Sequence, residues 1–323
     1  MTAWLPSSVS GRIYAALLLL LAVAPFLLRW LDQPFYLDVL SRGLILAIAV
    51  VSLNLILGYG GMVSLGHAAY IGIGAYSVGI PAYYDYYSGW LHLALALGVG
   101  GLFALITGAI CLRTKGVYFI MITMAFSQMI FFIFLSLEEY GADDGLVIYL
   151  RSEFPAWISM DSAFGLYYWI LAILLLALFF IHRLVHARFG RVIVGSKFNE
   201  QRMQALGFDT YRYRLACYVL SAMLCSVAGM LLGNFAGFIS PDIMSWPRSG
   251  ELIFMVIIGG VGTLFGPLVG TIAFVLLEEF LSAITVYWHL IFGVMLVALV
   301  LYGKGGIHGW LSLLDRREGG HGR

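Results

Sequence analysis

RLVHARFGRVIVGSKFNEQRMQALGFDTYRYR, residues 183–214, is a polar stretch between two long apolar segments, and it determines how the chain is arranged. Seven of the 18 lysines and arginines lie in it, with only two acids, Glu200 and Asp209. Basic segments between apolar spans stay on the cytoplasmic side of a membrane. The stretch therefore predicts a cytoplasmic loop of a membrane protein, and it offers a surface that a soluble partner could bind.

The composition indicates a chain that lipid surrounds over most of its surface. Hydrophobic residues make up 62 % of it, charged residues 11 %, and the mean hydropathy is +0.95. A soluble domain has about a quarter charged residues. The net charge of +1 says nothing about a nucleic-acid partner, but the sequence has no basic run interleaved with aromatics, so no nucleic-acid partner is expected. Three cysteines beside or within apolar segments suit a packed core better than a disulfide framework.

Apolar stretches long enough to cross a bilayer recur along the whole chain. A crossing helix needs about 20 such residues. The chain is therefore predicted to be all-α, one transmembrane domain over residues 1–323 with about 8–10 spans, some of them broken or re-entrant. The candidate spans are 13–30, 36–57, 62–80, 90–111, 117–136, 165–183, 213–238, 251–280 and 283–302.

The distribution of basic residues gives the predicted orientation. With the N-terminus in the cytoplasm, Arg113, Lys115 and the loop 183–214 fall inside, and the acidic loop 137–164 falls outside. The tail 303–323 carries four basic residues and is expected inside as well. Aromatic residues that suit the outer interface form one cluster: Tyr83, Tyr84, Tyr86, Tyr87 and Trp90.

Two glycine-rich breaks interrupt the apolar pattern. Three plain crossings after Arg214 would leave the tail outside, and GGVGTLFGP at 259–267 resolves this by splitting 251–280 into two short helices or a re-entrant pair. GYGG at 58–61 is the other break. We expect both breaks to gate a central path. The residues assigned to the path or its gating are Asn54, Gly60, Gly61, Ser64, His67, Gly259, Gly260 and Gly262.

Small residues recur at helical spacing in two stripes. Such stripes let helices approach closely in lipid. The first stripe, predicted to pack helices, is Ser221, Cys225, Gly229, Gly233 and Gly237. The second, for which packing and a role in the path both stay open, is Ser64, Ala68, Gly72, Ala75 and Gly79. His67 likewise suits a structural hydrogen bond, with gating as the alternative.

The chain has no recognisable chemistry of its own. The nearest match to a nucleotide-binding loop, residues 61–68, has His67 and Ala68 where lysine and a hydroxyl residue are needed. His182 and His186 are four residues apart but have no nearby carboxylate, so no metal site is predicted. Carboxylates fall near the span ends, which argues against an ion-coupled carrier. No nucleophile–base pair indicates an enzyme.

At the first break the residues match a known family. LNLILGYGGMVSLGHAAYIGIGAY, residues 53–76, closely resembles the signature of the branched-chain amino acid ABC-transporter permeases. Further similar motifs follow in order from about Leu44 to about Leu301: Gly190-Arg191, Asn199-Glu200 with Ala205-Leu206-Gly207, Ile239-Ser240-Pro241, and Ile258 to Pro267.

The resemblance implies a multi-span permease in a bacterial inner membrane that forms the path for branched-chain amino acids. Its implied partners are a homologous second permease, two cytoplasmic ATPases that bind ATP and magnesium, and a periplasmic substrate-binding protein. This chain would hold no cofactor. Alternatives are a sister permease for urea, short amides or aromatic acids, or an ion-coupled secondary carrier. The loops 137–164 and 239–250 are the expected docking surfaces for the binding protein.

The resemblance also gives the polar stretch a role. It implies that 199–207 contains a short coupling helix that rests on an ATPase. The residues assigned to coupling are Asn199, Glu200, Arg202, Ala205 and Gly207. The chain departs from the family pattern just before this segment, where Ser196-Lys197-Phe198 stands in place of a frequent Arg-Glu, and at Met203, where a small residue is common.

Overall fold

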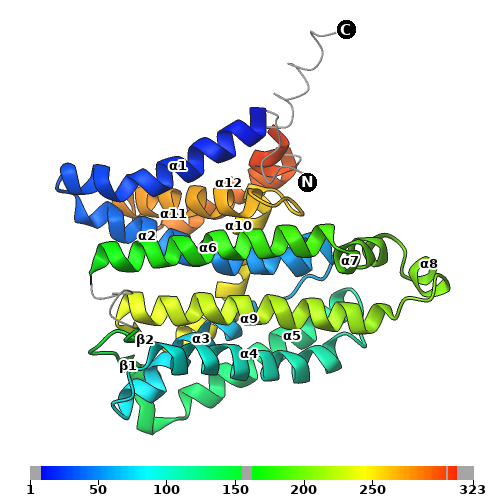
Figure 1. Cartoon of the computed structure of the whole chain (residues 1–323), viewed down its shortest axis with the longest axis horizontal. Coiled ribbons are helices and arrows are strands. Elements are labelled where there is room, and N and C mark those ends of the chain that lie inside the picture. Colours follow the sequence, from blue (N-terminus) through cyan, green and yellow to red (C-terminus); the bar gives the residue numbers. More distant parts are fainter. Residues whose placement is uncertain (1–8, 155–161, 303–304, 311–323) are drawn as a thin grey trace.

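A computed structural model describes residues 9–154, 162–302 and 305–310, and these residues are almost entirely helical (Figure 1). The α-helices are α1 Val9–Trp30, α2 Pro34–Asn54, α3 His67–Tyr83, α4 Gly89–Cys111, α5 Val117–Leu135, α6 Ala163–His186, α7 Arg188–Phe198, α8 Glu200–Ala205, α9 Thr210–Ala236, α10 Trp246–Gly259, α11 Gly266–Ile284 and α12 Trp288–Tyr302. A π-helix, Leu55–Tyr59, extends α2. The described part also holds three short 3-10 turns, two two-residue strands, β1 Leu146–Val147 and β2 Phe238–Ile239, and a helical turn at 306–310.

The predicted all-α membrane fold is confirmed. Among the described residues, seven helices are long and apolar enough to cross a membrane: α1, α2 with its π-helical extension, α4, α5, α6, α9 and α11. Three others, α3, α10 and α12, have 17, 14 and 15 residues. A 17-residue helix is about 25 Å long, less than the roughly 30 Å of the hydrocarbon core. The chain is a multi-pass membrane protein that combines long spans with shorter helices.

Two predicted spans have the wrong limits. The span 62–80 begins too early, because α3 starts only at His67 and residues 60–66 are not helical. Gly61 in this stretch has a φ of +67°, a conformation that ends a right-handed helix. The last span begins at Trp288 instead of 283. The break within 251–280 is present as predicted, with α10 ending at Gly259 and α11 starting at Gly266.

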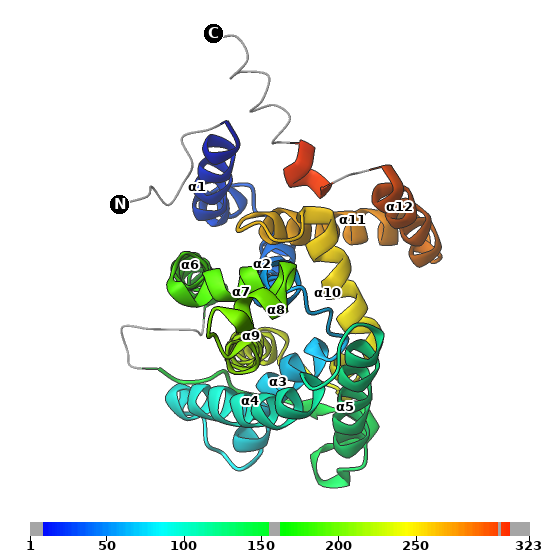
Figure 2. The ribbon, with the colours of Figure 1, turned by 90° about the vertical axis from the view of Figure 1, so that its right-hand side faces the viewer.

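The centre of the bundle is α9, which packs against α2, α3 and α4 (Figure 2). Within the apolar window of each helix, 83 % of the α2 residues are buried, against 17 % in α5. The helices α1, α5, α6 and α12 lie around this centre, and most of the outward side chains of α5 are apolar. These outer faces meet lipid or another membrane subunit.

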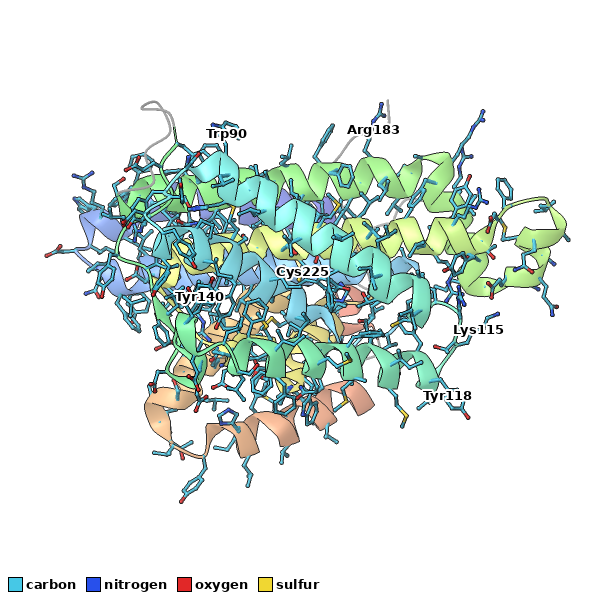
Figure 3. All side chains as sticks on the ribbon, turned by 90° about the horizontal axis from the view of Figure 1, so that it is seen from below. Trp90, Lys115, Tyr118, Tyr140, Arg183 and Cys225 are labelled. Atoms are coloured by element: carbon cyan, nitrogen blue, oxygen red, sulfur yellow. The ribbon has the colours of Figure 1, made fainter. Side chains whose placement is uncertain are left out.

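The ends of the bundle are chemically different. α7 and α8 project from one end, and β1 and β2 lie at the other (Figure 1). Lys115 lies near α8, whereas Trp90 and Tyr140 lie at the opposite end (Figure 3). The basic loop and Lys115 therefore share one end, in agreement with the predicted grouping of charges.

Part of the predicted tail lies next to the start of α1. In the described residues 305–310, His308 Nδ1 is 2.5 Å from the hydroxyl of Tyr14, and the two rings stack. The rest of the tail, with Lys304, Arg316, Arg317 and Arg323, and Asp161 of the acidic loop lie outside the described residues.

The two predicted docking loops are joined at the end away from α8. β1 and β2 pair antiparallel, with Leu146 opposite Ile239. Asn234 near the end of α9 accepts a hydrogen bond from the Ser152 backbone at 2.7 Å, and His92 Nδ1 lies 2.6 Å from the Ser152 hydroxyl. Buried amide and imidazole groups thus fix the position of the long loop.

Candidate functional site

Four residues of the first small-residue stripe lie in the close contact between α9 and α3. A Cβ atom added to Gly229 would lie 1.9 Å from the carbonyl oxygen of Ile71, and one added to Gly74 would lie 1.9 Å from that of Ser226. Only glycine permits backbones to approach this closely. Gly237 does not belong to this contact, because it ends α9 with a φ of +64°.

His67 links the start of α3 to α9. Its Nε2 lies 3.0 Å from Ser221 Oγ, and its Nδ1 lies 3.3 Å from Ser64 Oγ. Because the single Ser221 proton is donated to the Ser52 carbonyl at 2.5 Å, His67 Nε2 must donate and Nδ1 accepts from Ser64. The fully buried ring therefore has a packing role in this conformation. Ser64 precedes α3, so the second stripe begins at Ala68.

The two glycine-rich breaks, some 200 residues apart in the sequence, contact each other. Asn54 Nδ2 donates to the carbonyl of Thr263 at 2.8 Å, and Asn54 Oδ1 accepts from the amide of Gly262 at 2.9 Å. A Cβ atom on Gly58 would lie 2.5 Å from the Gly262 nitrogen. The carboxamide of Asn54 thus binds peptide groups that a broken helix leaves without partners. Gly260 and Gly262 need glycine, with φ of +117° and +78°.

Lys197 on α7 connects the basic loop to these breaks. Its Nζ donates to the carbonyl of Gly58 at 2.7 Å, and its aliphatic stem covers Gly61. Gly58 lies in the last turn of the π-helix, where carbonyls lack helical partners and the helix dipole favours a cation. Four groups from three distant segments are therefore linked in order: Lys197, Gly58, Asn54 and the 262–263 backbone.

The short helix within 199–207 is present as α8, directly after Lys197. Asn199 caps it by accepting from the Arg202 amide at 2.9 Å, and Gly207 follows it with a φ of +87°. Both residues suit these positions, since asparagine is a preferred N-cap and glycine a preferred helix terminator. Ala205 is the last helical residue and is exposed, as is Arg202.

Glu200 does not point toward a partner but binds within the chain. Its carboxylate lies 2.5 Å from Lys115 Nζ and 3.5 Å from Arg214 Nη1, and it accepts from the Thr210 hydroxyl at 3.2 Å. Partial burial acts to raise the pKa of this carboxyl, but the bond to Lys115 and the charge of Arg214 outweigh it and hold the pKa below its ordinary value. Glu200 thus fastens α8 to the bundle.

Two large apolar side chains stand out of the protein beside α8. Phe198 is 81 % exposed and Leu206 is 66 % exposed, on either side of Arg202. An exposed aromatic and an aliphatic residue next to an arginine are typical of a binding surface. Sequence reasoning missed both Phe198 and Leu206 as well as the link through Lys197. The signal for the pair was present, since they are large apolar residues in a polar loop.

Other candidate chemistry is sparse in the described part of the chain. There, no three histidine, cysteine or acidic side chains come together as metal ligands would. One buried side-chain nitrogen among these residues has no hydrogen-bond partner, Nε2 of Gln128 on α5. It borders a shallow groove on the outer face of that helix, which also holds Ser136.

The sequence match decides the family. Residues 35–300 match the family described as "Branched-chain amino acid transport system / permease component". The chain belongs to this family. In this permease the signature 53–76 folds as the end of α2, the π-helix, the first break and α3, so it supplies parts of both contacts described above.

Individual relatives agree with the family match. The permease is 26 % identical over 330 residues to the high-affinity branched-chain amino acid transport system permease protein LivM of Escherichia coli K12, covering 93 % of this chain and 76 % of the relative. It is 22 % identical over 320 residues to the probable LivM permease of Methanocaldococcus jannaschii, covering 80 % and 89 %. A shorter match, 28 % over 126 residues, is to the Escherichia coli permease LivH. No solved structure matches the chain.

Proposed function

We propose that this permease is the membrane subunit of an ATP-binding-cassette importer for branched-chain amino acids in a bacterial inner membrane. Its partners are a homologous second permease, two ATPases that bind ATP and magnesium, and a periplasmic binding protein. The permease itself has no nucleotide site and works as a transport subunit. The family and its LivM and LivH relatives support this proposal. The observation that carries the mechanism is the chain of contacts from α8 to the two breaks.

The ATPase binds at α8 in this proposal. Phe198, Leu206 and Arg202 form the contact surface, with the apolar pair inserted into a groove and the guanidinium donating to acidic or carbonyl groups. Glu200 keeps α8 attached to Lys115 and Arg214, so a force on α8 moves α7 and the start of α9 together. The basic character of 183–214 supports a cytoplasmic position for this end of the bundle, and both termini are proposed to be cytoplasmic as well.

Movement of α7 reaches the membrane through Lys197. When ATP draws the two ATPases together, α7 shifts and Lys197 pulls on the π-helical end of α2 at Gly58. Asn54 passes this shift to the 260–265 loop between α10 and α11. Hinges of this kind suit short helices joined by glycines, because the glycines absorb the backbone change.

The binding protein docks at the opposite end. The β1–β2 pair joins the loops 137–164 and 239–250 into one surface there. Glu138, Glu139, Asp143 and Asp144 precede β1 and give this surface a negative charge that can pair with basic residues of a partner. The solute is then released beside the loop that leads into α10.

The second permease packs on the face of α5. Lipid cannot supply a hydrogen bond to the buried nitrogen of Gln128, but a facing helix can, and such bonds hold membrane helices together. Apolar side chains surround Gln128 on this face, including Met129 and Phe132.

The proposal is tested by reconstituting the permease with its co-encoded partners in proteoliposomes. ATP inside and the loaded binding protein outside should drive uptake of labelled leucine, and uptake should stop without ATP. The double variant Phe198→Ser with Leu206→Ser should insert normally but lose ATPase binding and at least about tenfold of uptake. Uptake driven by a proton gradient without ATP, or uptake of urea in place of leucine, would contradict the proposal.

A further inference from the structure

A cavity of about 440 Å³ is lined by residues of α2, α3, α9, α10 and α11 and of the loop that follows β2. This volume is typical of sites for small molecules, about 300–1,000 Å³. Part of its wall is apolar, with Leu46, Ile71, Leu252 and Met255. Ser240 belongs to its rim, in the loop that follows β2 and that we assign to the docking surface.

Two ion pairs line the same cavity. Arg42 on α2 donates to Glu278 on α11 at 2.9 Å, and Arg248 donates to Glu251 on α10, also at 2.9 Å. Asp242 at the rim is the remaining charged side chain of the lining. The cavity therefore presents paired positive and negative groups beside an apolar wall.

The sequence pattern predicted that the carboxylates lie near the span ends, but Arg42 and Glu278 lie about two turns inside α2 and α11. Arg42 is eight residues past Pro34, about 12 Å along α2, and Glu278 is six residues before Ile284, about 9 Å along α11. Charges at such depth are costly and are found mainly where they serve a solute or ion path. Packing alone would be served as well by apolar residues of the same size.

We infer that this cavity is a binding site for the transported solute, a zwitterionic amino acid with an aliphatic side chain. This inference rests on the proposed transport function and adds the place where the solute binds. The carboxylate of the solute binds the guanidinium of Arg42, and its ammonium group binds Glu278. The ion pair between Arg42 and Glu278 opens to receive the two ends of the solute, so neither charge is left unpaired before or after binding. The aliphatic side chain lies on Leu46 and Ile71.

The presence of one positive and one negative group, Arg42 and Glu278, explains why the cavity would prefer zwitterionic solutes. A neutral amide or urea offers no charge to replace the partner that each ion of the pair loses, so opening the pair for it costs free energy. An acid without an ammonium group satisfies only Arg42. Zwitterions alone satisfy both ends.

Binding of leucine is measured by how much it protects an engineered cysteine in the cavity from a thiol reagent. The three native cysteines, Cys111, Cys217 and Cys225, are free and fully buried, so they suit a background that does not react. Leu46→Cys places one thiol in the cavity, four residues from Arg42 on the same helix. A membrane-impermeant cationic thiol reagent should modify it, and leucine should slow that modification. Leu276→Cys on the outer face of α11 is the control and should not react.

Vesicles of phosphatidylcholine and phosphatidylglycerol exclude lipid headgroups with a free amine. Protection by added leucine in these vesicles then comes from the free amino acid. Protection seen only when phosphatidylethanolamine is present would overturn the inference, because the cavity would then be a headgroup site.

Variants test the roles of the two charges. Arg42→Met with Glu278→Gln removes both charges and should raise the KM for leucine uptake about 10- to 100-fold, the loss expected for charge-assisted hydrogen bonds. Arg42→Glu with Glu278→Arg keeps an ion pair but reverses its direction, and should raise the KM similarly while stability is kept. Glu279→Gln is the matched control, since Glu279 neighbours Glu278 but does not line the cavity. ATPase activity stimulated by the binding protein should persist in all of them.

Each result has a separate meaning. An unchanged KM in both double variants, with leucine giving no protection of Leu46→Cys, overturns the inference while transport by the unmodified permease upholds the proposed function. If the unmodified permease fails to import leucine, the proposed function fails. The cavity is then judged by protection alone: protection by any zwitterionic amino acid but not by urea or acetamide supports the site, and protection by none overturns it.

Discussion

The α3–α9 contact and the contact between the two breaks both depend on glycine, but for opposite reasons. In the first, Gly74 and Gly229 are helical and let two backbones touch. In the second, Gly260 and Gly262 adopt φ values that other residues avoid, and hydrogen bonds from Asn54 replace helical ones. The first contact is tightly packed over a long interface, and the second is a few polar bonds between chain segments.

The difference separates a rigid part of the permease from a part that can move. A close helix–helix contact resists sliding, because every residue along it would have to move together. A junction of two or three hydrogen bonds can break and re-form at modest cost. The junction is also the part linked to α7 through Lys197. We therefore expect variants of the first contact to change assembly and variants of the second to change coupling.

Gly229→Ala should have the largest effect and tests the rigid contact. The new Cβ would lie 1.9 Å from the Ile71 carbonyl oxygen, so α3 and α9 must separate, at a cost of about 1–3 kcal/mol or more. Less protein in the membrane and a lower unfolding temperature in detergent are the expected results, measured by blotting and thermal denaturation.

Gly233→Ala is its matched control one turn later. There the nearest atom to a new Cβ is Ala75 Cα at 3.4 Å, an ordinary contact. Alanine also raises helix propensity, so stability should stay level or rise by up to about 1 kcal/mol. Equal losses in both variants would show that α3 and α9 do not approach as the structure has them.

Asn54→Leu should have the next largest effect and tests the junction. It leaves the partly buried Gly262 amide and Thr263 carbonyl without partners, at about 0.5–1 kcal/mol for each lost hydrogen bond. We expect uptake to fall at least about tenfold while the α3–α9 contact and membrane insertion persist. ATP-driven uptake in proteoliposomes and native-state cross-linking of α3 to α9 measure the two effects.

Thr271→Val serves as the control for the junction. Thr271 is buried on α11 just after the break, and its hydroxyl bonds only to Pro267 in its own helix. Its loss should change uptake less than about twofold. If Thr271→Val impairs uptake as much as Asn54→Leu, the effect belongs to α11 in general and the junction has no special role.

The sequence allowed most of the rigid part to be predicted. Apolar runs gave the spans, because a bilayer requires long continuous helices, and the four-residue period of Ser221 to Gly233 indicated a close-packed face. Even the break after Gly259 was visible, since glycine and proline end helices by local sterics. Helix spans, helix ends and close-packed faces depend on a residue and its near neighbours, so the sequence predicts them.

The junction could not be predicted, because its partners lie far apart in the chain. Asn54, Lys197 and Gly262 meet only after the bundle has formed, and no local pattern marks a side chain that will bind a distant peptide group. Glu200 shows the same limit: the resemblance assigned it to coupling with a partner, whereas Lys115, 85 residues earlier in the chain, binds it. Polar contacts between residues far apart in the chain were therefore the main feature that the sequence did not predict.

Lys197→Met should have a smaller effect that is specific to coupling. Lys197 is exposed, so losing its bond to the Gly58 carbonyl should lower stability by no more than about 1 kcal/mol. The amount of leucine imported per ATP hydrolysed should fall several-fold, while ATP hydrolysis continues, and Lys197→Arg should restore much of it. Arg188→Met removes an exposed cation from the same helix and should leave the ratio unchanged. If Lys197→Met imports as much leucine per ATP as the unmodified permease, the contact between Lys197 and Gly58 has no role in coupling.

Glu200→Gln should have the smallest effect and tests how α8 is fastened. The variant loses its ion pairs with Lys115 and Arg214, worth about 1 kcal/mol together, so α8 should open about fivefold more often. Hydrogen exchange of the α8 amides at neutral pH measures this. Because the pKa of Glu200 lies below its ordinary value, its contribution is complete above the ordinary carboxyl range and is lost as the pH falls through the lowered pKa. The unmodified permease should therefore approach the exchange behaviour of the variant only in acid. Faster exchange in the α3–α9 contact, instead of in α8, would mean that Glu200 supports the rigid part.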